Sequence, residues 1–168
     1  VVFDFDGVLV ESVDVKTEAF ARLFRDQPKE IIDKIIEHHL TNGGISRFEK
    51  FRYYYKYLLK RPLSKEKERE LGEKFSKMVV NLVIKASWVP GAIESLESLN
   101  NEFPLYVASG TPEKELLQIV EARGIDHYFK SIYGAPATKA DILRKIISSL
   151  GIESNDLLMI GDAISDYN

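Results

Sequence analysis

The sequence predicts an α/β fold, in which a parallel sheet forms the core and a long helical segment is inserted after the first strand. Three observations favour this class. Short apolar stretches recur along the chain, as expected for strands buried on both faces of a parallel sheet. After Pro90, helix-like and strand-like stretches alternate, which indicates parallel strands. Between residues 11 and 86, apolar residues recur only at helical spacing, so this segment is predicted to contain helices and no strand.

The expected strands are short and apolar. The first is the start of the chain, from Val1 to Phe5, and later apolar runs at residues 104–108, 131–133 and 157–160 predict three more. Ligands bind at the carboxyl ends of the strands in open parallel sheets. The residues directly after these runs are therefore the candidates for a site.

The helical segment at residues 11–86 has apolar side chains at steps of three and four, as at Phe48, Phe51, Tyr55 and Leu58. Glycine and proline interrupt this pattern at positions where helices are expected to end. We expect breaks at Asn42-Gly43-Gly44 and Arg61-Pro62, and four helices at residues 13–25, 30–40, 46–60 and 64–85.

Two carboxylates, Asp4 and Asp6, lie at the end of the first expected strand, and Gly7 follows them. Carboxylates crowded at such a position repel each other and lose hydration, so they usually need a metal ion or a shared proton. An ordinary solvated turn, in which Asp6-Gly7 merely ends the strand, explains this motif alone about equally well.

The second expected strand leads into Ser109-Gly110-Thr111-Pro112-Glu113. A hydroxyl, a glycine and a helix start together favour a bound anion, although an ordinary helix N-cap fits the same residues. Lys139 precedes an amphipathic run and is therefore placed at a helix start, where positive charge is disfavoured. Either Lys139 points to solvent or an anion nearby compensates it. The last strand is followed by two further acids, Asp162 and Asp166.

Taken together, these motifs resemble the haloacid dehalogenase superfamily, over the whole length of the chain. Its four motifs are matched in order by Asp4-Phe5-Asp6-Gly7-Val8, by Ser109, by Lys139, and by Gly161-Asp162 with Asp166. One departure is Ala140, since many relatives have proline directly after the lysine. The resemblance implies a Rossmann-like parallel sheet with helices on both faces, formed by residues 1–10 and 87–168, and an α-helical cap at residues 11–86.

The resemblance also implies phosphoryl transfer through an aspartyl-phosphate. Asp4 is then the nucleophile, and Asp6 protonates the leaving oxygen and later takes a proton from water, which requires a pKa above that of Asp4. Mg²⁺ is held by Asp4, by the backbone carbonyl of Asp6 and by Asp162. The phosphate oxygens are bound by Ser109, the Gly110 amide and Lys139. Asp166 orients Lys139 or a metal-bound water.

One segment of the helical insertion, Gly43-Gly44-Ile45-Ser46-Arg47-Phe48, places a positive charge in the first turn of a helix, where an anion is expected to face it. A similar segment occurs in the branch of the family that contains beta-phosphoglucomutase and phosphoglycolate phosphatase. There it reaches toward the part of the substrate that is not cleaved. By this resemblance Arg47, with Lys50 or Lys16 as weaker candidates, reads a second anionic group.

Composition and charge agree with an ordinary globular enzyme. The chain is 45% hydrophobic and 29% charged, has no cysteine, and contains no apolar run that could span a membrane. Residues 11–85 hold 17 Lys and Arg against 12 Asp and Glu, whereas the remainder holds 6 against 14. A basic lid over an acidic core suits anionic small molecules. The overall charge of −3 argues against nucleic acid as a partner. The cytoplasm is the expected location.

The sequence thus predicts a magnesium-dependent phosphatase that hydrolyses a small phosphorylated metabolite. A phosphosugar mutase of the beta-phosphoglucomutase type is the alternative enzyme, because Val8 and the Gly-Ile-Ser-Arg segment occur in such relatives. A receiver-like signalling domain is disfavoured by the long helical insertion, and a catalytically silent binding protein is disfavoured because no motif acid is missing.

We also expect the natural protein to be longer than these residues. The family's core usually continues beyond the fourth motif, and without that continuation the strand at residues 157–160 forms an uncovered apolar edge. From typical lengths of helices, strands and connections we expect a few more residues at the amino end and roughly 30 to 50 at the carboxyl end.

Overall fold

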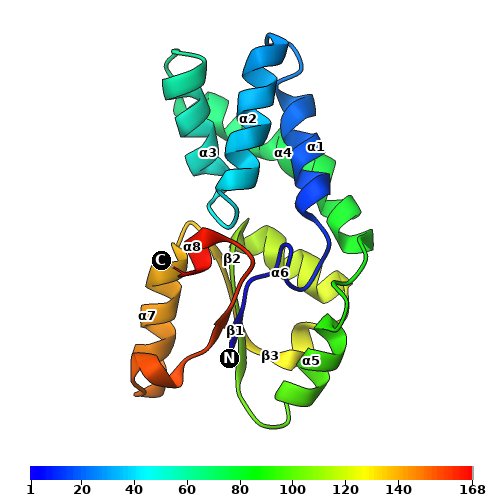
Figure 1. The fold of residues 1–168 in the computed structure, drawn as a ribbon, viewed down its shortest axis with the longest axis vertical. Helices are drawn as coiled ribbons and strands as arrows, with labels where there is room; N and C mark the ends of the chain where they lie inside the picture. Colours follow the sequence, from blue (N-terminus) through cyan, green and yellow to red (C-terminus); the bar gives the residue numbers. More distant parts are fainter. Residues whose placement is uncertain (168) are drawn as a thin grey trace.

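The protein folds into an α/β core with a layer of helices above it, in a computed structural model that describes residues 1–167 (Figure 1). The strands are β1 (Val2–Phe3), β2 (Leu105–Pro112), β3 (Phe129–Ala135) and β4 (Met159–Ile160). The upper helices are α1 (Val13–Leu23), α2 (Lys29–Thr41), α3 (Arg47–Tyr53) with the π-helical turn η1 (Tyr54–Leu58), and α4 (Lys65–Lys85). The core helices are α5 (Ala92–Leu99), α6 (Glu113–Ala122), α7 (Lys139–Leu150) and α8 (Ile164–Tyr167), with short 3₁₀ turns η2 (Asp126–Tyr128) and η3 (Ser154–Asp156).

The sheet has the order β3-β2-β1-β4, and all its neighbouring strands are parallel. Val2 of β1 pairs with Tyr106 of β2 on one side and with Met159 of β4 on the other. Every parallel connection needs a crossover, and helices supply these crossovers here. The predicted fold class, a parallel α/β core with helices on both faces and an inserted helical segment, is confirmed.

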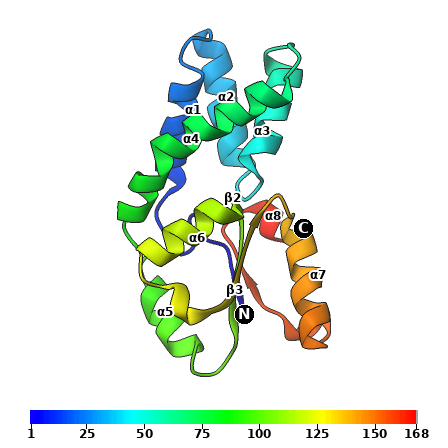
Figure 2. The same cartoon turned by 180° about the vertical axis from the view of Figure 1, so that it is seen from behind.

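The two faces of the sheet explain why the strands contain so few polar residues. Val2, Tyr106 and Ala108 pack against α7, whereas Phe3 and Val107 belong to the cluster that includes α5 and α6. Figure 2 shows α5 and α6 on one side of the strands and α7 on the other. A strand buried on both faces has no solvent side, so its apolar residues do not alternate with polar ones.

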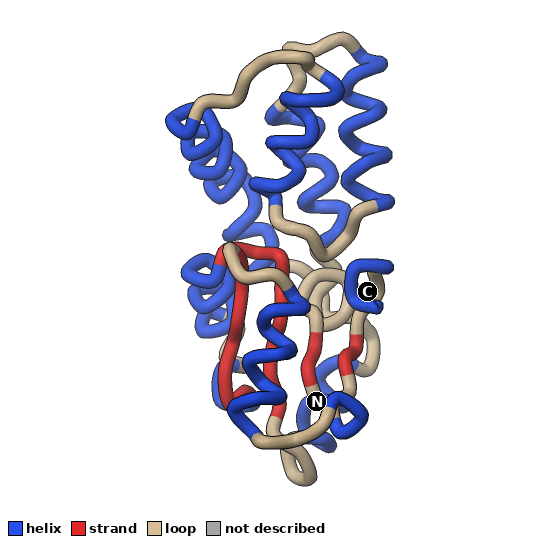
Figure 3. Tube along the Cα trace, turned by 90° about the vertical axis from the view of Figure 1, so that its left-hand side faces the viewer, coloured by secondary structure: helices blue, strands red, loops and turns tan. Residues whose placement is uncertain are grey.

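Helices α1 to α4 lie above the carboxyl ends of the strands (Figures 1 and 3). We call residues 11–86, which contain these helices, the cap. Aromatic side chains fill its interior, with Phe20 in contact with Phe51, Tyr54 and Phe75 at ring-centroid distances of 4.6 to 6.0 Å. Between α2 and α3, residues 42–46 form a loop that reaches down to the core, which we call the cap loop.

The two chain crossings between core and cap are joined to each other. Val10 pairs with Trp88 in an antiparallel bridge, and the Glu11 amide donates to the Ser87 carbonyl at 3.0 Å. Arg123, at the end of α6, lies with its guanidinium 3.7 Å from the centroid of the Trp88 ring and donates to three carbonyls at the end of α4. These contacts hold together the two segments by which the chain enters and leaves the cap.

One local expectation was wrong, and another is refined. The helix expected at residues 46–60 is regular only to Tyr53, because the following turn widens: the Leu59 amide donates to the Tyr54 carbonyl, five residues back, at 2.8 Å. The helix start expected within Ser109-Gly110-Thr111-Pro112-Glu113 lies at the end of that segment, at Glu113, because β2 continues to Pro112 with an irregular register. Apolar spacing does not distinguish a π turn from an α turn, and Ser-Gly-Thr-Pro fits either a strand end or a cap.

Strand β4 lies beside β1 at the edge of the described sheet, in the place expected for it. Leu158, directly before it, is 58% exposed. Among residues 1–167, no helix combines the length and the apolar character that crossing a membrane requires.

Candidate active site

The candidate site lies where the carboxyl ends of β1 and β4, the end of β2 and the start of α7 meet beneath the cap loop. Asp4 follows β1, Ser109 lies in β2, Asp162 follows β4 and Lys139 is the first residue of α7. The parallel sheet brings these residues together because equivalent strand ends share one edge. Four motifs that are far apart in the sequence thus surround one position.

Asp4 is almost completely buried, with 2% of its surface exposed. One carboxylate oxygen accepts from the Phe5 amide at 2.6 Å, and the other accepts from the Lys139 ammonium at 2.7 Å. Burial raises the pKa of Asp4 to about 7, and Lys139 opposes this rise. Asp4 is therefore a fixed carboxylate whose charge depends on the cations around it.

The side chain of Asp6 faces a different set of partners. It accepts from the Ser12 hydroxyl at 2.5 Å, from the Lys16 ammonium at 2.5 Å and from the Thr111 hydroxyl at 3.1 Å. Burial acts to raise the pKa of Asp6, but Lys16 and the hydroxyl donors outweigh it and leave the pKa below its usual value. Lys16, a weaker candidate for reading the substrate, is here a partner of Asp6 and Thr111.

The order of these two acidities in the structure is the reverse of the expected one. The pKa of Asp4 is raised and that of Asp6 is lowered, whereas the sequence-based mechanism required Asp6 to be the weaker acid. The physical reason is that Asp6 has an ammonium and two hydroxyl donors, while Asp4 is more dehydrated and shares its one ammonium with Asp166. A divalent cation beside Asp4 acts in the opposite direction, because it stabilises the ionised carboxylate.

The surroundings of Lys139 decide between the two alternatives, a side chain that points to solvent and one compensated by a nearby anion. Its ammonium is buried and pairs with both Asp4 and Asp166. Burial acts to lower the pKa of Lys139, but the two carboxylates outweigh it and raise the pKa. Anions therefore compensate the positive charge at this helix start, and Thr138 caps the helix by accepting from the Asp141 amide.

Three carboxylates form the candidate metal site. Oxygens of Asp4, Asp162 and Asp166 all lie within 4.8 Å of one another. Gly7 lies directly against Asp162, and a Cβ at Gly7 would come within 2.2 Å of a carboxylate oxygen. Hard oxygen donors in this number fit a cation such as Mg²⁺. The Asp6 side chain lies outside this cluster, so a metal contact of Asp6 through its backbone carbonyl stays a prediction.

Ser109 and Gly110 lie in β2 below the cap loop. Ser109 is buried and its hydroxyl oxygen accepts from the Thr111 amide at 3.1 Å. A Cβ at Gly110 would meet the Gly44 carbonyl oxygen at 2.3 Å, so only glycine at this position lets β2 and the cap loop approach this closely. The predicted role of both residues in binding phosphate oxygens stays a prediction.

The cap loop contacts the core at the motif residues themselves. The Ser165 hydroxyl donates to the Gly43 carbonyl at 2.7 Å. Gly44 has a φ of +75°, and a Cβ there would lie 2.3 Å from the Ser165 hydroxyl oxygen and 2.8 Å from the Lys139 ammonium. The loop is therefore built of residues without side chains where it covers the buried lysine.

Arg47, the predicted reader of a second anionic group, already has an anionic partner. Its guanidinium donates to both carboxylate oxygens of Glu115 on α6, and also to the Ser76 hydroxyl on α4 at 3.0 Å. It lies 4.6 Å from the centroid of the Phe75 ring. The side chains of Arg47 and Glu115 are only 4% and 9% exposed, so this ion pair joins cap and core in a buried position.

A cavity of about 320 Å³ opens between core and cap. Asp6, Gly110 and Asp162 belong to its core side, and Lys50 and His39 to its cap side. A space of this size holds a small ligand.

Sequence reasoning did not identify Ser12, Thr111, Glu115 and His39 as part of this region. Ser12 and Thr111 support Asp6, and Glu115 holds Arg47. Thr111 was noticed only within the Ser-Gly-Thr-Pro turn. Glu115 looks like any acid in the first turn of a helix, and no local pattern in the sequence distinguishes it.

Buried carboxylates and a lysine at the strand ends of a parallel sheet, beneath a helical cap, define an enzyme that handles anionic molecules. The family model described as haloacid dehalogenase-like hydrolase matches residues 1–168. The chain belongs to this family, as its motifs predicted.

Relatives and solved structures resemble almost the whole chain. It is 26% identical to phosphoglycolate phosphatase from Mannheimia succiniciproducens, over 98% of this chain and 77% of that protein. It is also 26% identical to phosphoglycolate phosphatase 1 from Pseudomonas aeruginosa, over 99% and 63%. A hydrolase from Pseudomonas syringae has the same fold, with a TM-score of 0.73 and 21% identity over 98% of this chain and 76% of that one. The relatives' names support the predicted class of enzyme, a phosphatase.

Proposed function

We propose that this protein is a magnesium-dependent phosphatase that hydrolyses a small phosphate monoester through an aspartyl-phosphate. The observation that carries the proposal is the buried carboxylate of Asp4, which lies beside Lys139 and within reach of Asp162 and Asp166. A carboxylate attacks a phosphate only if nearby cations offset the repulsion between the two anions. Lys139 supplies one such cation.

In this proposal Asp4, Asp162 and the backbone carbonyl of Asp6 hold Mg²⁺. A bound ion would supply charge neutralisation for the phosphate oxygens and for Asp4. Asp166, which pairs with Lys139, orients that lysine. The test of the metal site is binding itself: Mg²⁺ raises the melting temperature of the protein, and the rise is lost in Asp162→Asn.

The protein's own groups divide the remaining work. Asp4 forms the bond to phosphorus while the bond to the leaving oxygen breaks. Asp6, whose pKa is lowered by Lys16 and the hydroxyl donors, must first take up a proton from solvent, and it then gives that proton to the leaving oxygen. Water then attacks the aspartyl-phosphate, with its proton passing to Asp6, and inorganic phosphate leaves. Ser109 and the Gly110 amide donate to the transferring oxygens, and Lys139 neutralises charge on them.

The division of labour follows the two parts of the molecule. The core, residues 1–10 and 87–168, performs the reaction, and the cap, residues 11–86, excludes water and selects the substrate. The relatives named phosphoglycolate phosphatase make short phosphorylated acids the first substrates to test. A substrate-binding role of Arg47 stays a prediction. The cytoplasmic location of the protein also stays a prediction.

The decisive experiment is a screen of phosphate monoesters with Mg²⁺, scored for phosphate release. Release that disappears when Mg²⁺ is removed supports the proposal. An isomerised sugar phosphate without release identifies a mutase instead. No turnover on any ester contradicts both enzyme assignments.

A further inference from the structure

The ion pair between Arg47 and Glu115 joins three helices at one point. Arg47 is the first residue of α3 in the cap, and Glu115 lies in the first turn of α6 in the core. The guanidinium donates to both carboxylate oxygens of Glu115. The Ser76 hydroxyl, on α4, accepts from Arg47 at 3.0 Å and donates to Glu115 at 2.5 Å. The three side chains therefore form a closed ring of hydrogen bonds between cap and core.

This ring fixes an orientation as well as a contact. A guanidinium that gives two N–H groups to one carboxylate is held in a single plane, which an ammonium is not. The side chains of Arg47 and Glu115 are both almost fully buried, and the pair exists only while the cap packs on α6. Because the cost of burying two charges largely offsets their attraction, such a pair contributes more to geometry than to stability.

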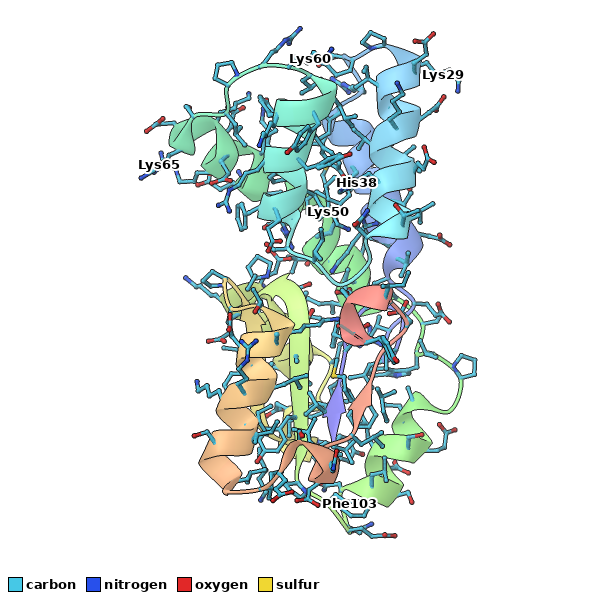
Figure 4. All side chains as sticks on the ribbon, turned by 60° about the vertical axis from the view of Figure 1, so that its left-hand side comes forward. Lys29, His38, Lys50, Lys60, Lys65 and Phe103 are labelled. Carbon is cyan, nitrogen blue, oxygen red and sulfur yellow. The ribbon has the colours of Figure 1, made fainter. Side chains whose placement is uncertain are left out.

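The ion pair lies at one end of the cap loop. Residues 42–46 lead directly into Arg47, and Figure 4 shows this part of α3, marked by Lys50, in the region of the cap nearest to the core. Near the other end of the loop, the Gly43 carbonyl accepts from the Ser165 hydroxyl at 2.7 Å. The loop contains two glycines, which give it little rigidity of its own. The core thus holds a flexible loop on both sides.

Between these two attachments the loop covers groups that the proposed reaction uses. A Cβ at Gly44 would lie 2.8 Å from the Lys139 ammonium, and a Cβ at Gly110 would lie 2.3 Å from the Gly44 carbonyl oxygen. Backbone this close leaves no room for water between the loop and these residues. A small displacement of the loop is therefore enough to admit water to Lys139.

We propose that Glu115 is a positioning residue of the site: by holding Arg47, it seats the cap loop over Lys139. The inference rests on the proposed function, because it makes the seated loop a condition for phosphoryl transfer. A seated loop excludes bulk water from the buried charges of the site, and electrostatic interactions are stronger there than in water. The substrate contacts neither member of the ion pair, so every ester depends on the pair to the same extent.

The same contacts distinguish this role from the one that the resemblance predicted for Arg47. A substrate anion that reaches the guanidinium has to displace Glu115 and Ser76. That exchange leaves the buried carboxylate of Glu115 without a cation, which is costly. Arg47 therefore acts on the position of the loop and not on the substrate.

The first test measures how well the loop covers Lys139. Acetic anhydride acylates lysine amines, and mass spectrometry compares the labelling of Lys139 with that of the exposed Lys130 in the same molecule. The double variant Arg47→Met with Glu115→Met removes both charges together. We expect its relative labelling of Lys139 to rise about 10-fold, because the loop opens locally more often. Unchanged labelling overturns the inference.

A second ion pair supplies the matched control. Arg52 donates to both oxygens of Glu68 at 2.6 and 3.3 Å, and this pair joins α3 to α4 entirely within the cap. Arg52→Met with Glu68→Met should leave the labelling of Lys139 unchanged. An equal rise in both double variants attributes the change to general loosening of the cap and overturns the inference. Urea denaturation checks folding, and if the first double variant does not fold, Glu115→Gln is measured in its place.

The second test is kinetic and compares two esters in the presence of Mg²⁺, ethyl phosphate and 2-phosphoglycolate, of which only the latter has a carboxylate. We expect the double variant of Arg47 and Glu115 to lose about 10-fold in kcat on both esters, with KM little changed. A loss confined to 2-phosphoglycolate assigns Arg47 to substrate binding and overturns the inference. Wild-type kcat on both esters also overturns it.

Labelling needs no turnover, so it separates this inference from the proposed function. If no ester is hydrolysed but the labelling of Lys139 depends on the ion pair, the reaction is wrong and the positioning of the loop stands. If esters are hydrolysed and neither labelling nor kcat depends on the pair, the positioning is wrong and the reaction stands.

Discussion

The core end and the cap end of the candidate site differ in how their charges are balanced. At the core end, Lys139 is held between Asp4 and Asp166, and Asp6 is held by Lys16 and two hydroxyl donors. At the cap end, the Lys50 ammonium is buried and contacts only His39, and no carboxylate of residues 1–167 forms a salt bridge with it. The comparison teaches that the groups proposed for the reaction are positioned in advance by charged neighbours, whereas Lys50 is buried without an anion to balance its charge.

The largest expected effect comes from the core end. Asp4→Asn removes the nucleophile while keeping the shape of the side chain, so we expect kcat to fall about 10³-fold or more. The fold and the affinity for substrate remain largely unchanged. Stopped assays for phosphate release measure kcat, and calorimetry measures the affinity for substrate. Retention of more than a few per cent of the wild-type rate contradicts the covalent mechanism.

Substitutions in the ion pair between Arg47 and Glu115 test whether this buried pair stabilises the packing of the cap on the core. Glu115→Ala leaves a buried guanidinium without a carboxylate, which costs about 3–5 kcal/mol of unfolding free energy. Urea denaturation measures the loss. Replacing both residues by methionine should restore most of the stability, and a double variant as unstable as the single one contradicts this explanation.

The cap loop lies where the core end and the cap end of the site meet, and a substitution at Gly44 tests how close this contact must be. In Gly44→Ala the new methyl group collides with Ser165 and with the Lys139 ammonium, so we expect kcat/KM to fall roughly 10-fold, about 1.4 kcal/mol of transition-state stabilisation. Gly151→Ala is a matched control, because Gly151 also has a positive φ but open space around it. Both variants carry the same kind of backbone strain. Equal activities would show that strain alone matters.

The smallest effect concerns the unpaired charge at the cap end. The pKa of Lys50 falls from 10.5 to about 7 in the folded protein, through burial and then through Lys16. A lowered lysine pKa costs stability fully below pH 7, and the cost disappears as the pH rises toward 10. Lys50→Met should therefore raise the unfolding free energy at pH 6, by about 1 kcal/mol or more, and raise it less at pH 9. Equal gains at both pH values contradict a buried, uncompensated ammonium.

The sheet was predictable because its strands are apolar on both faces, a pattern that solvent-exposed segments do not have. The position of Lys139 at a helix start was predictable for a similar reason, since the amphipathic run that follows it marks the first turn. Both inferences depend on residues that are neighbours in the sequence. Local pattern is enough when the physical cause is local.

The partners of the site residues were not predictable in this way. Lys16 meets Thr111 from 95 positions away, and Arg47 meets Glu115 from 68 positions away, so these pairs exist only once the cap packs on the core. The resemblance to a family gave Arg47 a role but could not reveal the buried acid beside it. The acidity of Asp4 and Asp6 likewise depends on burial and on partners from distant elements.

The packing of Arg123 against Trp88 has a practical consequence. Trp88 is the single tryptophan of the chain, and it lies where the chain returns from the cap to the core. Its indole ring rests on a guanidinium that also binds the end of α4. Any tilt of the cap that disturbs this stack changes the surroundings of the only indole, so the protein carries its own fluorescent reporter of cap motion and needs no added label.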